Sequence, residues 1–296
     1  MPAGGPRSLA SIQVDVTTRL GAIAPATTTG MASLDRALGG GLRSGTHLLV
    51  SGDHGTGKTA FVLMLAYMAA RARASVIFAS VGLDETEVVS RLAARALHRE
   101  YQNAQATYGT IWSGQSMQDA ALRGPIASCL DTVAKKVGEY LHLHVAEPME
   151  DVSVIAGHAA FLWSRNERVV VVVDGAEAFS AGAGPPGVST APPLLASSYD
   201  GRLSTVAYEL SRLAGQGCAV ITTCHSSTAS LLAPATTVAA ELRPVREPGP
   251  RSTSRRKPIV EHKPVDFVIV KNRLGPTPTL PLVYATGASV FEERPP

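Results

Sequence analysis

Hydrophobic residues fall into short apolar runs, typical of buried strands, and into longer segments where they recur at helical spacing. The clearest run is residues 169–173, five consecutive valines. Further strands are predicted at residues 47–50, 75–80, 141–145, 218–223 and 237–242. Helices are predicted at residues 35–38, 60–73, 85–99, 125–140, 152–165 and 202–214. Strands that alternate with helices predict an α/β fold, in which a mostly parallel central sheet carries helices on both faces.

The two ends of the chain depart from this alternation. A C-terminal β-hairpin with a turn at Gly275 and Pro276 is predicted from strands at residues 266–271 and 280–284. Residues 1–27 are rich in Gly, Pro, Ala and Thr, which predicts a flexible N-terminal arm. Part of this arm, residues 8–20, is patterned enough to form either a helix or an extended segment.

Between these ends, residues 28–292 are predicted to form one domain. Two segments inside it carry no strand or helix pattern. Residues 180–200 are dominated by Gly, Pro, Ser and Ala, which predicts a mobile loop. Residues 244–264 are rich in Pro and Arg, which predicts a basic disordered insertion. Residues 100–124 show a mixed pattern from which no element is predicted.

Composition narrows the class of protein. Of 296 residues, 45% are hydrophobic and 17% are charged, which is typical of a chain that folds around a core. The formal net charge of +3 permits a nucleic-acid partner without arguing for one. The cysteines are scattered without a CxxC spacing, which argues against a disulfide framework or a zinc site. With no signal peptide and no membrane-length apolar segment, a soluble cytoplasmic protein without a membrane partner is expected.

A phosphate-binding loop is predicted at residues 52–59, where GDHGTGKT matches G-x-x-x-x-G-K-S/T. Glycines let the backbone approach a phosphate closely, and the helix that follows adds its N-terminal N–H groups. Lys58 is expected to neutralise the β- and γ-phosphates of ATP, and Thr59 to hold Mg²⁺. The residues expected to contact the nucleotide are Gly52, Asp53, His54, Gly55, Thr56, Gly57, Lys58, Thr59 and Ala60.

A second acidic position supports this site. Asp174 directly follows the five-valine strand, as the metal-binding aspartate does in P-loop proteins. Ligands bind at the carboxyl ends of strands in parallel sheets, so Asp174 and the loop are expected to meet at one edge. Thr59 and Asp174 together predict a Mg²⁺ site, and ATP with Mg²⁺ is the predicted cofactor pair.

Longer stretches carry a family resemblance. TGMASLDRALGGGL precedes the loop, GKTAFVLMLA follows it, and FASVGLDETEVVSRLAARAL and ITTCHS lie further along. The chain closes with DFVIVKNRLGPTPTLPLVYATGASVFE. Together these segments resemble the RecA-type ATPase domain of the DnaB replicative helicase family, over residues 27–292. The resemblance implies a RecA-like fold, self-assembly into a ring (a hexamer, for example) or a filament, and ATP-driven movement along DNA.

The resemblance also implies roles for individual residues. Lys271 and Arg273 occupy the positions that would reach the γ-phosphate of a neighbouring subunit; without the resemblance they would be read as solvated basic residues of a hairpin. His225 stands where the family carries a polar sensor, usually glutamine. It can report on the γ-phosphate or be an ordinary loop histidine. The catalytic residues implied are therefore Lys58, Asp174, His225, Lys271 and Arg273.

One departure from the family concerns the catalytic glutamate. Gly82 falls at its position. Asp84, Glu85 or Glu177 could reach inward instead, although the sequence favours a helix-capping or surface acid at each of these positions. Because general-base assistance contributes roughly 10²–10⁴ in rate, slow hydrolysis is one expectation. The family's N-terminal helical domain also has no counterpart, so functions that depend on it are not expected.

A basic segment, residues 243–263, gives a reason to expect single-stranded DNA as a partner. Flexible basic segments bind phosphates by counterion release, without sequence preference. The segment lacks aromatic residues for base stacking, so a solvated linker remains an alternative. Its basic residues are Arg243, Arg246, Arg251, Arg255, Arg256, Lys257 and Lys263.

Three functions are compatible with the sequence. The first is a DNA-associated ATPase of DnaB helicase type, favoured by the closing K-x-R-x-G-P segment. The second is a recombinase- or KaiC-like ATPase, favoured by GGGL before the phosphate loop. The third is a nucleotide-gated assembly or regulatory protein that hydrolyses ATP slowly, favoured by Gly82.

Overall fold

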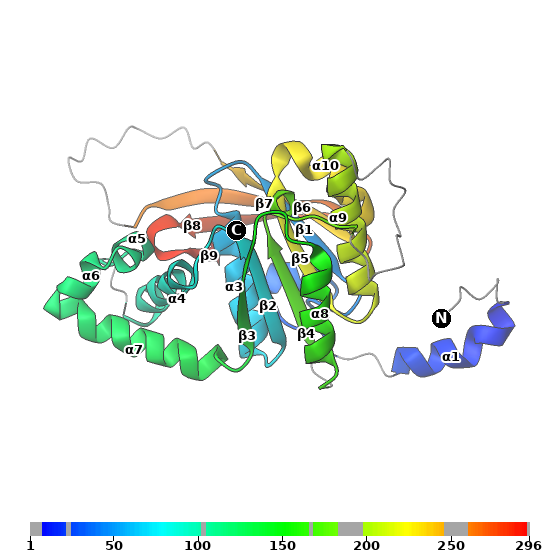
Figure 1. Cartoon of the computed structure of the whole chain (residues 1–296), viewed down its shortest axis with the longest axis horizontal. Helices are drawn as coiled ribbons and strands as arrows, with labels where there is room; N and C mark the ends of the chain where they lie inside the picture. Colours follow the sequence, from blue (N-terminus) through cyan, green and yellow to red (C-terminus); the bar gives the residue numbers. More distant parts are fainter. Residues whose placement is uncertain are drawn as a thin grey trace.

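The computed structural model describes residues 8–21, 25–101, 105–165, 168–182, 198–245 and 260–294. Within these residues one nine-stranded sheet has the order β3-β2-β4-β5-β1-β6-β7-β8-β9 (Figure 1). The strands from β3 to β6 in that order are parallel, and β7, β8 and β9 are antiparallel additions. The strands are β1 His47–Gly52, β2 Ser75–Val81, β3 Leu141–Ala146, β4 Val169–Asp174, β5 Ala219–His225, β6 Val238–Pro244, β7 His262–Asn272, β8 Thr279–Ala285 and β9 Val290–Glu293.

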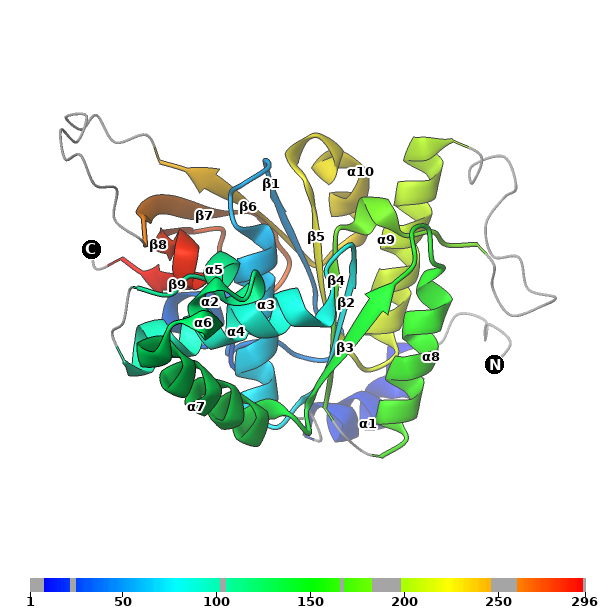
Figure 2. The same ribbon diagram turned by 60° about the vertical axis from the view of Figure 1, so that its left-hand side comes forward.

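Helices cover both faces of the sheet, as Figures 1 and 2 show. Helices α3, α4 and α7 pack on one face, and α8 and α9 on the other. The helices are α1 Leu9–Gly21, α2 Ala32–Ala37, α3 Lys58–Arg71, α4 Glu85–Glu100, α5 Tyr108–Trp112, α6 Gln115–Gln118, α7 Ala120–Val137, α8 Val152–Trp163, α9 Tyr199–Gly215 and α10 Ala229–Leu232. Short 3₁₀ turns are η1 Ala176–Ala178, η2 Ser226–Thr228, η3 Ala233–Ala235 and η4 Thr286–Ala288. None of the described helices is both long and apolar enough to cross a membrane.

The packing of β4 on both faces explains why its five valines are not interrupted by a polar residue. Val170 and Val172 contribute to the core under α3, whereas Val169, Val171 and Val173 contribute to the core under α8 and α9. A strand covered on both faces needs apolar side chains on both, so it does not alternate with polar residues. The predicted α/β fold with a doubly covered, mostly parallel sheet is confirmed.

Helix α7 begins earlier than the sequence pattern predicts. It starts at Ala120, with Asp119 as N-cap accepting a hydrogen bond from the Ala121 N–H at 2.8 Å. Pro125 therefore lies inside the helix and not at its first turn. Proline favours a first-turn position, so the predicted start at residue 125 was wrong because the aspartate cap outweighed that preference. The unassigned residues before it include α5 and α6, short helices outside the parallel sheet.

The C-terminal hairpin is confirmed and extended by a third strand. Strand β9 pairs with β8, and the Phe291 ring stacks on that of Tyr284 with centroids 4.3 Å apart. Strand β7 begins at His262, so the end of the predicted insertion 244–264 is a strand paired with β8. Residues 246–259 of that insertion, and 183–197 of the predicted loop 180–200, lie outside the described residues.

On the N-terminal side, the sequence predicted either a helix or an extended segment for residues 8–20. The structure has a helix there, α1. Thr27 then joins the domain through reciprocal backbone hydrogen bonds with Leu42, at 2.7 and 2.8 Å. The domain therefore has its first backbone pairing at Thr27, one residue before the predicted boundary.

A buried histidine at the start of β1 makes the stability depend on pH. The His47 ring lies between two hydroxyls, with Nδ1 2.7 Å from Ser211 Oγ and Nε2 2.9 Å from Thr222 Oγ1. Burial, assisted by the charge of Lys271, lowers the pKa of His47 from 6.5 to about 3. Because the folded pKa is the lower one, this residue stabilises the fold above the unfolded pKa. That contribution is lost as the pH falls towards 3.

From about pH 7 to about pH 5, this residue is expected to lower the free energy of unfolding by about 2 kcal/mol. Glutamine in a His47→Gln variant retains hydrogen-bonding groups but does not titrate, so the fall should shrink by that amount. Denaturant unfolding at both pH values measures it. The exposed His142, changed to Gln, is the control. An unchanged pH dependence in His47→Gln would show that the proton is taken up elsewhere.

Candidate nucleotide-binding site

The phosphate loop connects the end of β1 to the start of α3. Gly57 lies in the left-handed region, with φ of 91°, and forms the N-cap of α3. A Cβ at this position would lie 2.7 Å from a ring carbon of Tyr284 and 2.9 Å from Phe291. Only glycine satisfies both the backbone angle and the close approach of the C-terminal strands. The loop is therefore built against β8 and β9, with its N–H groups at the helix N-terminus.

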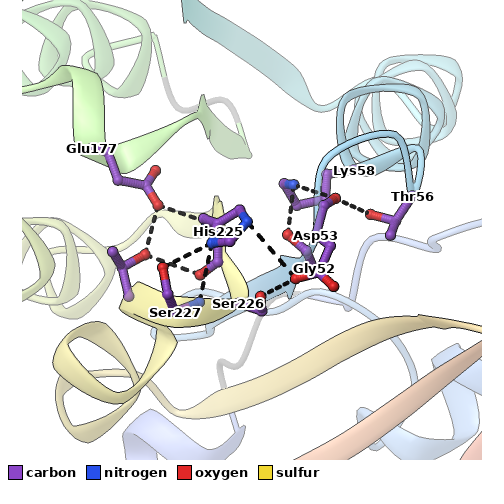
Figure 3. A network of polar contacts seen from close by, with 9 residues as sticks. Gly52, Asp53, Thr56, Lys58, Glu177, His225, Ser226 and Ser227 are labelled. Carbon is purple, nitrogen blue, oxygen red and sulfur yellow. Dashed lines mark hydrogen bonds and ion pairs between the residues drawn. The ribbon is translucent and has the colours of Figure 1, made fainter.

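The ammonium of Lys58 lies over the loop itself, as Figure 3 shows. Nζ donates to the carbonyl oxygens of Gly52 at 2.7 Å and Asp53 at 3.0 Å. Burial lowers the pKa of Lys58, and the carboxylates of Asp174 and Glu177 oppose that shift. An anionic phosphate brought to this loop would compete with the two carbonyls for the ammonium, and its charge gives the stronger hydrogen bond.

Thr59 and Asp174 meet as predicted at the carboxyl edge of the sheet. The Thr59 hydroxyl donates to Asp174 Oδ2 at 2.7 Å, and the Thr223 hydroxyl donates to Oδ1 at 2.7 Å. Burial raises the pKa of Asp174, and these two hydrogen bonds and the Lys58 charge oppose the rise. A hydroxyl and a carboxylate are the oxygen ligands that Mg²⁺ prefers. The described residues contain no group of three or more His, Cys, Asp or Glu side chains able to hold a metal alone. The pair thus suits an ion completed by phosphate and water.

A cavity of about 1130 Å³ opens beside this pair. It runs from the phosphate loop past Gly82, at the end of β2, to Tyr108 and Tyr284. Its size slightly exceeds the usual range of small-molecule sites, which leaves room for a nucleotide. The predicted contact residues that line it are His54, Gly55, Gly57, Lys58, Thr59 and Ala60.

His225, at the end of β5, is connected to the phosphate loop through Asp53. Its Nε2 lies 3.8 Å from Asp53 Oδ1, and its ring centroid lies 4.8 Å from that of His54. The hydroxyl of Ser226 also donates to Asp53 Oδ1. Figure 3 shows this contact between the loop and the turn after β5. A change at the phosphate loop can therefore be transmitted to β5 through Asp53.

Glu177 is a cavity residue that sequence reasoning left among several alternatives. Its Oε1 accepts hydrogen bonds from the His225 backbone N–H and the Thr228 hydroxyl, both at 2.6 Å. Asp84 instead caps α4 through the Glu87 N–H at 2.6 Å, and Glu85 is exposed. Neither of these two lines the cavity, whereas Glu177 does. Its place three residues after Asp174 was the only sequence signal.

Lys271 and Arg273 lie at the opposite edge of the sheet. Strand β7 is antiparallel to β6, so its C-terminal end is beside the amino end of β1 and away from the loop. The ammonium of Lys271 donates to three carbonyls of its own chain, those of Ala233 (2.7 Å), Pro234 (3.1 Å) and Thr236 (2.6 Å). Arg273, two residues further, is exposed. One chain thus brings together Lys58, Thr59, Asp174 and His225 but not this pair.

Comparisons with known proteins agree with this fold. Residues 27–108 match the sequence model of the family described as "ATPase: KaiC". A solved DnaB-like replicative helicase, described with its interactions with primase, is 17% identical, with a TM-score of 0.71 over 97% of this chain and 67% of that chain. The ATPase domain of G40P is 18% identical, with a TM-score of 0.72 over 98% of this chain and 100% of that one. No curated protein sequence matches the chain.

Proposed function

Since the chain has a RecA-like fold similar to DnaB-type ATPase domains, we propose that it binds ATP with Mg²⁺ and couples hydrolysis to movement along DNA. The observation that carries this proposal is the meeting of three residues at one edge of the sheet. Lys58 lies over the phosphate loop, and the Thr59 hydroxyl and the Asp174 carboxylate are hydrogen-bonded beside it. A cation, a glycine loop and two oxygen ligands together are what a Mg²⁺–nucleotide complex requires.

Each predicted site residue has a role in this proposal. The backbone of the loop, residues 52–60, binds the phosphates, and Lys58 neutralises the charge on the β- and γ-phosphates. Thr59 and Asp174 would hold Mg²⁺, which would supply positive charge against the charge that develops on the phosphates. His225 reports the state of the γ-phosphate through its contact with Asp53.

Assembly with further copies of the chain is the second part of the proposal. Lys271 and Arg273 would serve the nucleotide of an adjacent subunit in a ring or filament, with Arg273 as the exposed member of the pair. Single-stranded DNA would bind basic residues between positions 243 and 263. Residues 28–292 would act as one ATPase domain.

A nucleotide-gated assembly protein with little hydrolysis is the second candidate. Gly82 favours it, because the end of β2 presents no carboxylate to the cavity. In this alternative, bound ATP stabilises an assembly and turnover only resets it. A KaiC-like ATPase without DNA is a variant of the first candidate, supported by the family match over residues 27–108.

Steady-state ATP turnover with Mg²⁺, measured with and without single-stranded DNA, separates these candidates. For a DNA motor, we expect turnover above that of a loop variant and a clear increase on adding DNA. Turnover that does not respond to DNA would favour a KaiC-like ATPase. Tight ATP binding without turnover would contradict the motor and favour the gated assembly.

A further inference from the structure

We propose that Glu177 is the general base of this site, taking the proton from the water that attacks the γ-phosphate. The inference rests on the proposed ATPase function and names the residue that would carry out its proton transfer. The base would then lie in the turn after β4, because Gly82, at the end of β2, has no side chain that can accept a proton.

The position of Glu177 is set by the strand that also positions Asp174. The hydroxyl of Thr223 binds Asp174, and the backbone N–H of His225, two residues further on β5, binds Glu177. Both carboxylates therefore stand at the end of β5, at the same edge of the sheet. Among the described residues that line the cavity, Asp174 and Glu177 are the only carboxylic acids. The charge of Glu177 also acts on the Lys58 ammonium, which places it within electrostatic reach of the phosphate site.

The two carboxylates are not equivalent. Both oxygens of Asp174 receive hydroxyl hydrogen bonds, from Thr59 and Thr223, which fits a metal ligand held in place. Glu177 receives both of its hydrogen bonds on Oε1, one from Thr228 and one from His225, which Figure 3 shows. Within the described residues, Oε2 has no such donor. Oε1 thus fixes the carboxylate, and Oε2 is available to a water molecule in the cavity.

The end of β2 leaves space for that water. Gly82 has a φ of 82°, and no atom lies within 4 Å of a Cβ built on it. The left-handed angle disfavours any residue with a side chain there. None of the next three acids lines the cavity: Asp84 caps α4, Glu85 is exposed, and Glu87 pairs with Arg91 at 2.6 Å. Glu177 approaches the same cavity from the other side, across β4.

In the proposed hydrolysis, Glu177 accepts the proton that the attacking water loses. The water oxygen forms a bond to the γ-phosphorus while one of its protons passes to Glu177 Oε2. The bond from the γ-phosphorus to the bridging oxygen breaks, and ADP leaves with the electron pair. Phosphate is released, and Glu177 returns its proton to solvent. Such base assistance contributes roughly 10²–10⁴ in rate.

Replacing Glu177 by glutamine tests the role without removing its structural contacts. The amide oxygen of glutamine still accepts from His225 and Thr228, but the group no longer accepts a proton. In single-turnover assays with excess protein, the hydrolysis rate of Glu177→Gln should fall about 100-fold or more. Binding of the non-hydrolysable analogue AMPPNP should change by less than about two-fold. Glu85→Gln, an exposed acid at the start of α4, is the matched control and should retain the wild-type rate.

Three outcomes would overturn the proposal. If Glu177→Gln hydrolyses ATP at the wild-type rate while Glu177→Ala does not, Glu177 only holds the turn after β5. If Glu177→Gln loses AMPPNP binding together with turnover, the residue serves binding. If the wild-type protein binds AMPPNP but shows no hydrolysis above a Lys58→Ala variant, the ATPase function itself fails, which the wild-type assay reveals independently of any change at Glu177.

Discussion

Replacing Lys58 by alanine is expected to reduce ATP turnover by at least about 10²–10³-fold and to weaken ATP binding. The ammonium is the cation held over the phosphate loop, with two carbonyl oxygens as its partners in the chain. Each hydrogen bond from a charged group contributes about 1.5–3 kcal/mol. Phosphates that develop charge during hydrolysis would lose that contribution most, so the rate should fall further than the affinity.

The assay compares turnover and AMPPNP affinity of Lys58→Ala with those of Lys135→Ala. Lys135 is an exposed lysine on α7 that pairs with Asp131 at 2.6 Å, so its loss leaves the cavity untouched. Thermal unfolding of both variants checks the fold, since Lys58 also supports the loop carbonyls. Wild-type turnover in Lys58→Ala would show that the hydrolysis comes from a contaminant or from another site.

The meeting of the predicted phosphate loop, Thr59 and Asp174 at one edge could be predicted from sequence because its parts are local. A strand, a glycine loop and a helix are consecutive in the chain, and β4 carries Asp174 at its end. The parallel sheet then brings both to the same edge, whatever the rest of the fold does. The apolar character of the valine run also predicted a strand covered on both faces.

Other features depend on contacts between distant segments, and sequence patterns do not report these. Strand β9 has only four residues and forms because it pairs with β8 and stacks Phe291 on Tyr284. Glu177 could not be chosen over Asp84 or Glu85, because its partner is a backbone N–H of β5, 48 residues away. The family resemblance implies a trans-acting cation at Lys271, but its carbonyl partners, Ala233, Pro234 and Thr236, appear only in the folded chain.

The order and direction of the strands place Arg273 far from the phosphate loop of its own chain. Replacing it therefore tests whether ATP turnover depends on assembly. Its backbone N–H donates to the Thr237 carbonyl at 3.0 Å, beside the amino end of β1. The length of β1, six residues, then separates it from the phosphate loop, and the five steps between these residues span roughly 17 Å at about 3.3 Å each. In the proposed assembly, Arg273 would therefore reach a nucleotide only in another copy of the chain. Arginine donors at a transferring phosphoryl group contribute about 10³–10⁵ in rate.

We accordingly expect Arg273→Ala to lose turnover by about 10³-fold or more while retaining AMPPNP binding, because the phosphate loop of each subunit is intact. Arg36→Ala, an exposed arginine on α2 near the same edge, is the control.

Mixing Arg273→Ala with Lys58→Ala provides the stronger test, because each variant supplies what the other lacks. In a random one-to-one assembly, roughly a quarter of heterologous interfaces would pair an intact loop with an intact arginine. Turnover should then reappear in the mixture although each variant alone is inactive. A mixture that stays inactive under conditions where the chains co-assemble would contradict a role for Arg273 across the interface.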